Sequence, residues 1–168
     1  LGGDLKVNST HGKGSDFHFV LKFDFPTIDQ QIHKENSIPI FNKSHKILLV
    51  EDTPLNQLVA TELIKKYMPG SIIHLAENGQ IAIDKISLEP LDLVLMDVKM
   101  PVMDGITATK KIRLSEVNRI KITPIVGLTA NAIDEQIQEC LKSGMNDYVT
   151  KPIDPKDLFT KIKKQLES

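Results

Sequence analysis

Short apolar runs alternate with longer amphipathic segments along most of the chain. The apolar runs are KILLV at 46–50, SIIHLA at 71–76, LDLVLMD at 91–97, TPIVGLTA at 123–130 and NDYVT at 146–150. The segments that follow them carry apolar residues at helical spacing and cover 54–68, 79–88, 105–114, 132–143 and 155–166. Strands that alternate with helices predict an α/β fold, in which five parallel strands form one sheet.

The apolar positions also predict which surfaces are buried. The runs LLV and LVLM show no alternation of apolar and polar residues, which indicates a parallel sheet covered by helices on both faces. Helical stripes that we expect to face the core are Leu55, Leu58, Val59 and Leu63; Ile133, Ile137, Cys140 and Leu141; and Leu158, Ile162 and Leu166.

The first 45 residues have a different pattern. Strict alternation places Phe17, Phe19, Leu21 and Phe23 on one face of a half-buried strand. The preceding LKVNS and THGKGS predict a second strand and a turn, and thus a β-hairpin. Residues 26–45 are polar, contain two prolines and show no periodicity, which is typical of a linker. We therefore expect three parts: 1–25, a linker at 26–45, and a domain at 46–168.

Composition narrows the possible settings and partners. The 21 Lys and Arg residues balance 22 Asp and Glu residues, so net charge gives no reason to expect nucleic acid or an anionic membrane as a partner. The single cysteine, Cys140, cannot form an internal disulfide, and we interpret it as a small buried apolar residue. No signal peptide or membrane-spanning run is found, which favours a cytoplasmic setting. The opening LGGDL indicates a fragment that begins within a domain.

Polar residues gather at the ends of the predicted strands. These residues are Glu51 and Asp52 after the first strand, Asp97 after the third, Thr129 after the fourth, and Lys151 and Pro152 after the fifth. The carboxyl ends of parallel strands meet at one edge of a sheet, where ligands bind. A single acid at such a place would be explained as a helix cap, as we expect for Asp104 and Thr53. Four strand ends with polar groups indicate a site instead.

Three neighbouring carboxylates repel one another unless a cation lies among them, and oxygen ligands suit Mg²⁺. The absence of cysteine or histidine at these strand ends disfavours zinc. Mg²⁺ often takes phosphate oxygens as further ligands, and a lysine and a threonine hydroxyl can position a phosphoryl group. Asp97 follows the central strand and is the candidate nucleophile, with Glu51 and Asp52 as candidate metal ligands.

These motifs resemble the receiver domain of two-component signalling. The matching stretches are VEDTPLNQ, LMDVKMPVMDG, GLTA and DYVTKP, in the family's order, within residues 46–166. EDTPLNQ, with Asn56 after the acids, resembles receivers attached to hybrid sensor kinases. The resemblance implies a flavodoxin-like, doubly wound sheet of five parallel strands with helices on both faces.

The resemblance also implies roles for individual residues. Asp97 would accept a phosphoryl group from a phosphohistidine, carried by a kinase dimerisation domain or a histidine phosphotransfer protein. Mg²⁺ would be bound by Asp52, Asp97 and the main-chain carbonyl of Lys99, with Glu51 acting through water. Thr129 and Lys151 would contact the phosphoryl oxygens.

Further roles concern the change that follows phosphorylation. In the family a threonine moves inward and an aromatic residue on the fifth strand follows, which identifies Thr129 and Tyr148 as switch residues. The Lys151–Pro152 peptide bond would be cis. The side chains of Lys99 and Asn131 would tune the loss of the phosphoryl group. The expected state is a monomer or weak dimer.

The first 25 residues resemble the end of the ATP-binding domain of a sensor histidine kinase. Gly12 and Gly14, in GKGS, match a turn that approaches the nucleotide, and LGGDLKVNS and FHFVLKF match its flanks. The rest of the nucleotide pocket is absent from this sequence. None of the histidines lies in a sequence that resembles a kinase phosphoacceptor helix; they are His11, His18, His33, His45 and His74. We therefore expect a histidine kinase as the parent protein, but no useful ATP binding and no autophosphorylation by this chain.

Two other functions compete with this interpretation. Phosphatases that form an aspartyl phosphate on a similar sheet resemble DxDx[TV], with the second aspartate as the acid. Lys99 occupies that position here, which argues against a phosphatase. A phosphorylation-independent interaction module of the same fold would tolerate loss of the polar residues at the strand ends, and all of them are present.

Overall fold

The computed structural model describes residues 3–10, 12, 14–21, 38–130 and 134–167, in two compact units. The predictions for the linker at 26–37, for Phe23, for His11 and His33, and for Asn131 and Ile133 lie outside the described residues. Among the described residues, no helix is both long enough and apolar enough to cross a membrane.

The first unit is an antiparallel β-hairpin, as expected. Strand β1 (Gly3–Thr10) pairs with strand β2 (Gly14–Leu21), and Val7 lies opposite Phe17. Gly12 and Gly14 have φ angles of 77° and 96°, the left-handed region that glycine enters without steric cost. The side chains of Val7 and Phe17 are exposed, so the expected half-burial of Phe17 is wrong. A single two-stranded ribbon buries little on its own faces.

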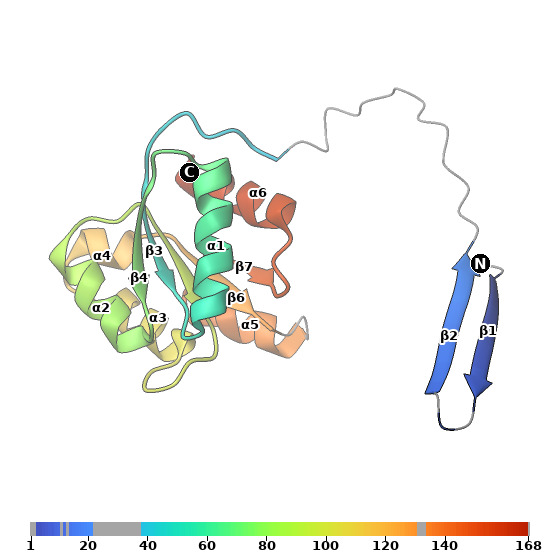
Figure 1. Cartoon of the computed structure of the whole chain (residues 1–168). Helices are drawn as coiled ribbons and strands as arrows, with labels where there is room; N and C mark the ends of the chain where they lie inside the picture. Colours follow the sequence, from blue (N-terminus) through green and yellow to red (C-terminus); the bar gives the residue numbers. More distant parts are fainter. Residues whose placement is uncertain (1–2, 11, 13, 22–37, 131–133, 168) are drawn as a thin grey trace. The chain divides into compact units, whose positions relative to one another are not determined.

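The second unit contains a parallel sheet of five strands, in the order β4-β3-β5-β6-β7. The strands are β3 (Lys46–Val50), β4 (Ile72–Ala76), β5 (Leu93–Asp97), β6 (Ile125–Thr129) and β7 (Asp147–Thr150). The apolar residues of the three central strands are fully covered, because helices pack on both faces. This is the doubly wound arrangement expected from the sequence (Figure 1).

The helices connect successive strands and divide between the two faces of the sheet (Figure 1). They are α1 (Pro54–Tyr67), α2 (Gly79–Leu88), α3 (Gly105–Arg113), α4 (Asn118–Ile122), α5 (Asp134–Lys142) and α6 (Pro155–Leu166). Proline begins both α1 and α6, where its missing N–H costs no helical hydrogen bond. Asn78 caps α2 by accepting from the N–H groups of Gln80 and Ile81 at 3.0 Å each.

Two apolar clusters form the core, one on each face of the sheet. The first-face cluster joins the sheet to α2, α3, α4 and α5, and includes Ala82, Ile112, Ile120 and Cys140. The second-face cluster joins the sheet to α1 and α6, and includes Ile64, Leu158, Phe159 and Ile162. The expected burial of Cys140 and of the α6 stripe is confirmed.

The expected core stripe of α1 is wrong. Leu55, Leu58 and Val59 are 66%, 57% and 50% exposed, whereas Ala60 and Ile64 are buried. The helix therefore turns a different face to the sheet from the one that its largest apolar residues suggested. Only Leu63 of the predicted stripe packs, partly buried, against the second-face cluster. On α5, Leu141 is likewise 39% exposed.

The short helix α4 was not expected from the sequence. Its five residues are too few to show helical periodicity. Arg119 donates from its guanidinium to the carbonyls of Ile86 and Ser87 at the end of α2, at 3.1 and 2.9 Å. This short helix is therefore associated with contacts to residues distant in sequence and not with a local sequence pattern.

The described end of the predicted linker packs on the second unit. Ile38 and Phe41 lie against the second-face cluster, and the Phe41 ring is 6.0 Å from the ring of Phe159 in an edge-on arrangement. The centroid of the Tyr67 ring lies 4.9 Å from the centroid of the same Phe159 ring. Phe159 thus joins α6, α1 and the chain that leads into β3.

We predict that Phe159→Ala lowers the free energy of unfolding by about 3–5 kcal/mol, because it leaves a cavity at this junction. Urea unfolding of the purified chain measures the change. Leu88→Ala, at a side chain that is 83% exposed, is the control and should change stability by less than about 0.5 kcal/mol. Equal effects of the two substitutions would contradict the packing described here.

Candidate functional site

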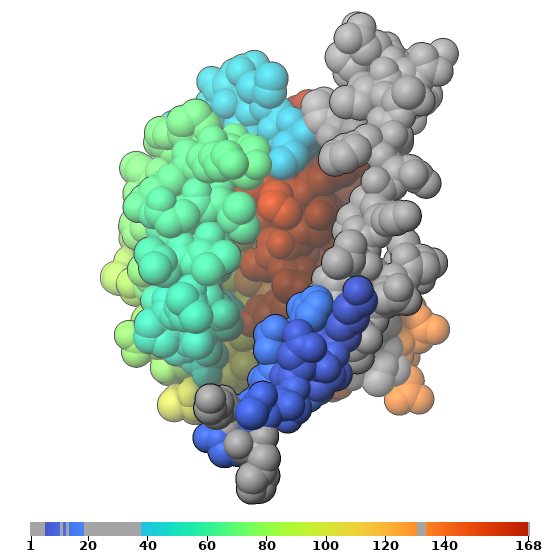
Figure 2. All heavy atoms as spheres, turned by 45° about the vertical axis from the view of Figure 1, so that its right-hand side comes forward, coloured from blue at the N-terminus to red at the C-terminus, as the bar shows by residue number. Residues whose placement is uncertain are grey.

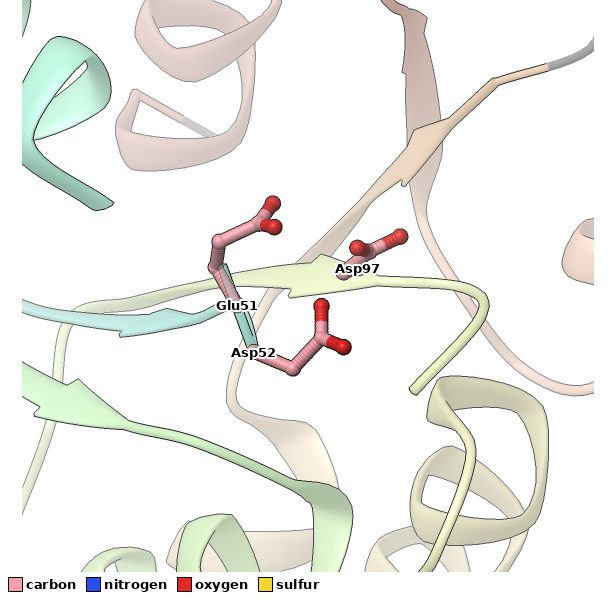
Figure 3. A group of neighbouring side chains, drawn as sticks. All are labelled: Glu51, Asp52 and Asp97. Atoms are coloured by element: carbon pink, nitrogen blue, oxygen red, sulfur yellow. The ribbon is translucent and has the colours of Figure 1, made fainter. Parts of the chain in front are cut away.

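The candidate site lies at the carboxyl edge of the sheet, where β3 and β5 end side by side. Val50 of β3 pairs with Met96 of β5, so the next residues, Glu51 and Asp97, are neighbours. Asp52 follows Glu51 in the turn before α1. The structure thus brings together three acids that are distant in sequence, and Figure 3 shows their carboxylates around one space.

The three carboxylates are close enough to share one cation. One oxygen from each of Glu51, Asp52 and Asp97 lies within 4.8 Å of the others. Glu51 is 1% and Asp97 6% exposed, because Glu51 follows β3 and Asp97 ends β5, and both strands are buried on both faces. Asp52 is more exposed and opens the cluster to solvent. An all-oxygen set with one open side fits Mg²⁺, which keeps several water ligands.

Lys151 reaches into this cluster from the end of β7. Its Nζ lies 2.6 Å from Glu51 Oε2 and 2.7 Å from Asp97 Oδ2. One ammonium group cannot balance three carboxylates, so the cluster keeps an excess of negative charge. A divalent cation beside Asp52 and Asp97 would neutralise that excess.

Glu51 is held by more donors than the other acids. Burial raises the pKa of its carboxyl, but hydrogen bonds from Lys151 and Asn56 outweigh burial and place the pKa below its ordinary value. Asn56 Nδ2 donates to Glu51 Oε1 at 2.9 Å, and Gln57 Nε2 donates to the Glu51 carbonyl at 2.6 Å. These roles of Asn56 and Gln57 were not expected from the sequence. The sequence feature that could have indicated them is the pair of amide side chains on the first turn of α1, just after Glu51 and Asp52.

Asp97 shows the opposite shift. Burial raises the pKa of its carboxyl and prevails over the hydrogen bond from Lys151, and the charge of Glu51 raises the pKa further. The Lys99 N–H donates to Asp97 Oδ1 at 3.2 Å, a long hydrogen bond that compensates only in part. For Lys151, burial lowers the pKa, but the two carboxylates outweigh burial and raise it.

The remaining predicted residues lie on β6 and β7. Thr129 ends β6 and is buried, and its carbonyl accepts from the Lys151 N–H at 2.7 Å. The Lys151–Pro152 peptide bond is cis, as expected. Tyr148 lies on β7 opposite Gly127, further from the carboxyl edge than Thr129. The ligand role of the Lys99 carbonyl and the switch roles of Thr129 and Tyr148 stay predictions.

The loop after Asp97 is fixed at the start of α3. Asp104 accepts from the Thr107 N–H at 2.7 Å and caps the helix, as expected. Gly105 is required here, because a Cβ at this position would overlap the Asp97 carbonyl oxygen. Thr53 occupies the N-cap position of α1, as expected, but its side chain makes no cap hydrogen bond. Its hydroxyl lies 3.3 Å from Asp52 Oδ1 instead.

This fold and this site define a class of signalling domain. The family described as the response regulator receiver domain matches residues 47–163. The chain belongs to this family. Its membership confirms the resemblance drawn from the sequence motifs.

Several sensor kinases contain a region similar to this chain. Sensor protein GacS of Pseudomonas syringae is 40% identical over 121 residues, which are 71% of this chain and 13% of GacS. Aerobic respiration control sensor protein ArcB of Escherichia coli is 33% identical over 167 residues, which are 98% of this chain and 20% of ArcB. Hybrid signal transduction histidine kinase G of Dictyostelium discoideum is 42% identical over 67% of this chain and 3% of its own length. The chain therefore spans a fifth or less of these relatives.

Two solved structures of receiver-domain proteins or their complexes are similar to this chain. The receiver domain of sensor histidine kinase PA1611 from Pseudomonas aeruginosa, with a magnesium ion in its active-site cleft, has a TM-score of 0.68 and 36% identity, and covers 75% of this chain and 100% of its own. The second structure is a chain from the complex of the Saccharomyces cerevisiae histidine phosphotransfer signaling protein Ypd1 with the receiver domain of Ssk1. It has a TM-score of 0.65 and 33% identity, and the match covers 73% of this chain and 88% of that chain.

We predict that Asp97→Asn raises the free energy of unfolding at pH 7. The pKa of Asp97 is higher in the folded than in the unfolded chain, so its ionisation destabilises the fold as pH rises above the ordinary value of 3.8. The advantage of the variant should therefore be present at neutral pH and shrink as pH falls towards 3.8. Urea unfolding between pH 3.5 and about 8 measures it.

Asp84→Asn provides the matched control for this experiment. Asp84 lies on the exposed side of α2, where it accepts from Gln80. Its replacement should give no comparable pH-dependent gain. A gain for Asp97→Asn that does not vary with pH would contradict the assigned shift.

Proposed function

We propose that Asp97 is the phosphoacceptor of this receiver domain and takes the phosphoryl group of a phosphohistidine. The observation that carries the proposal is the position of its carboxylate. Its carboxylate belongs to the cluster with Glu51 and Asp52, and its Oδ2 atom also lies 2.7 Å from Lys151 Nζ. In the transfer, an Asp97 oxygen forms a bond to phosphorus as the bond between phosphorus and imidazole nitrogen breaks. The electron pair of that bond stays with the imidazole.

The proposed metal site uses oxygen ligands alone. Asp52, Asp97 and the main-chain carbonyl of Lys99 would hold Mg²⁺, and Glu51 would contribute through water. When bound, Mg²⁺ supplies positive charge that offsets the charge of the carboxylates and the phosphoryl oxygens. The excess negative charge of the cluster and the magnesium ion of the PA1611 receiver support this assignment.

Lys151 and Thr129 complete the acceptor site. The Lys151 ammonium already contacts Asp97, so a small movement would bring it to an oxygen of the transferred group, where it would offset negative charge. Thr129 ends the strand adjacent to β5, and its hydroxyl is the proposed donor to another phosphoryl oxygen. Glu51, held by Asn56 and by the Thr53 N–H, would keep Lys151 in place.

The parent protein is proposed to be a hybrid sensor histidine kinase. The similarity to ArcB over 98% of this chain supports a kinase that continues into a receiver. Residues 1–25 would end its ATP-binding domain, with Gly12 and Gly14 in the former nucleotide loop, and residues 26–45 would form the linker. The hairpin and the positive φ angles of both glycines are consistent with this origin.

The proposed partner is a helix that carries the phosphohistidine, and it would dock on α1. The α1 patch, which we define as Leu55, Leu58 and Val59, is exposed beside the acid cluster. A hollow of about 210 Å³ lies next to it, between α1 and the loop after β7, and its lining includes Val59, Leu128 and Ile153. Figure 2 shows α1 (blue-green) and α6 (red) on this face of the molecule. The complex that contains Ypd1 supports a histidine phosphotransfer protein as this kind of partner.

We predict that acetyl phosphate with Mg²⁺ labels the chain and that Asp97→Asn abolishes the labelling, because an amide cannot accept the phosphoryl group. Phosphate-affinity electrophoresis measures the labelled fraction. Asp84→Asn, which removes an exposed carboxylate from α2, should label like the unaltered chain. Labelling that persists in Asp97→Asn would contradict the acceptor assignment. A chain that cannot be labelled at all would favour the phosphorylation-independent interaction module.

We also predict that Leu58→Ser slows phosphoryl transfer from a purified, phosphorylated histidine phosphotransfer domain by about tenfold, because a partner helix loses the burial of one leucine. Labelling by acetyl phosphate should not change, since Leu58 does not touch the acid cluster. Leu88→Ser replaces another exposed leucine, at the end of α2, and should leave both rates unchanged. An equal loss with both donors would contradict docking on α1.

A further inference from the structure

The ammonium group of Lys161, on α6, makes three contacts at the open edge of the sheet. It donates to the main-chain carbonyl of Tyr148 at 2.6 Å and to Asp157 Oδ2 at 2.9 Å. It also lies 4.6 Å from the centroid of the Tyr148 ring. The strand β7 that carries Tyr148 is at the end of the strand order, so within the described part of the chain no strand pairs with its outer side. Lys161 therefore covers an edge that would otherwise stay open.

Lys161 reaches this position from the opposite layer of the domain. Its helix packs through Leu158, Phe159 and Ile162 into the second-face cluster. Tyr148 pairs with Gly127, which shares a face of the sheet with Ile125 of the first-face cluster. The lysine side chain thus passes around the edge of β7, and it is only 22% exposed there.

The three contacts respond differently to a turn of the Tyr148 ring. The hydrogen bond to the carbonyl involves only the backbone and survives any change of the side-chain rotamer. The ion pair with Asp157 lies within α6 and survives as well. Only the cation–π contact is lost when the ring leaves its place. That contact therefore favours the observed ring orientation over any other, by about two- to fivefold in population.

We propose that Lys161 is a positioning residue that holds the Tyr148 ring at the edge of β7 and so sets how readily phosphorylation moves it. The inference rests on the proposed function and on the role of switch residue that the sequence resemblance predicts for Tyr148. A ligand shifts such an equilibrium only by the difference in its interactions with the two states. The cation–π contact is present only while the Tyr148 ring holds its observed position. Removing this contact therefore makes it easier for phosphorylation to move the ring.

The test compares Lys161→Met with Lys161→Arg in the full chain. Methionine keeps much of the apolar stem and removes the charge, whereas arginine keeps a cation that can lie over the ring. Lys164→Met is the matched control, because Lys164 lies on the same helix, 3.6 Å from Asp147 on β7, and carries the same charge. The chain has two tyrosines, so ¹³C-labelled rings report Tyr148 beside Tyr67 as an internal reference.

Each protein is titrated with beryllofluoride, which mimics a phosphoryl group, in the presence of Mg²⁺. We expect the midpoint of the Tyr148 resonance change to fall by about two- to fivefold in Lys161→Met and to stay near that of the unaltered chain in Lys161→Arg and Lys164→Met. Without beryllofluoride, Lys161→Met should already shift the Tyr148 resonance towards its end point, with Tyr67 unchanged.

Two results would overturn the inference. The first is a lower thermal midpoint of Lys161→Met with the Tyr148 resonance and the beryllofluoride midpoint unchanged, which would show a purely structural lysine. The second is an equal effect of Lys164→Met, which would show a general effect of charge. If no protein responded to beryllofluoride, the proposed function would fail, and the resonances without it would still report the contact of Lys161 with the ring.

Discussion

The charge balance at the end of the sheet is the constraint on which the rest of the structure depends. Parallel strands β3 and β5 are buried on both faces and carry Glu51 and Asp97 out of the core side by side. Burial makes each carboxylate costly, and the single ammonium of Lys151 binds both. The site therefore carries excess negative charge. A bound cation would neutralise this charge, and neutralisation of the Asp97 carboxylate would reduce it.

The asymmetry between the two carboxylates follows from the number of donors around each. Glu51 receives hydrogen bonds from Lys151, Asn56 and the Thr53 N–H, which keep it ionised. Asp97 has Lys151 and one long bond from the Lys99 N–H, and its pKa is raised. Because few protein groups stabilise the ionised form of Asp97, its carboxylate can still gain stabilisation from an incoming ligand. The same geometry therefore distinguishes Glu51, which three donors hold, from Asp97, the proposed phosphoacceptor.

The sequence predicted the elements and the site better than it predicted the surfaces. Each strand and each of the five long helices lies within a few residues of its expected range, because apolar runs and amphipathic segments are local features. The stripe on α1 was interpreted as core, yet Leu55, Leu58 and Val59 face outward. Hydrophobic spacing shows that a helix has an apolar face. It does not show whether the sheet or a partner covers that face.

The sequence by itself determined the alternation of strands and helices and the chemical groups that end each strand, since both are written in neighbouring residues. Only the tertiary structure decided that Lys151 bridges Glu51 and Asp97, and that Asn56 and Gln57 hold Glu51. It also decided that Lys161 covers the edge of β7 beside Tyr148. For Lys151 the physical reason is distance along the chain: Glu51 and Lys151 are 100 residues apart, and their contact exists only once the sheet has formed. Asn56 and Gln57 are close to Glu51 in sequence, but their contacts depend on how α1 leaves the end of β3.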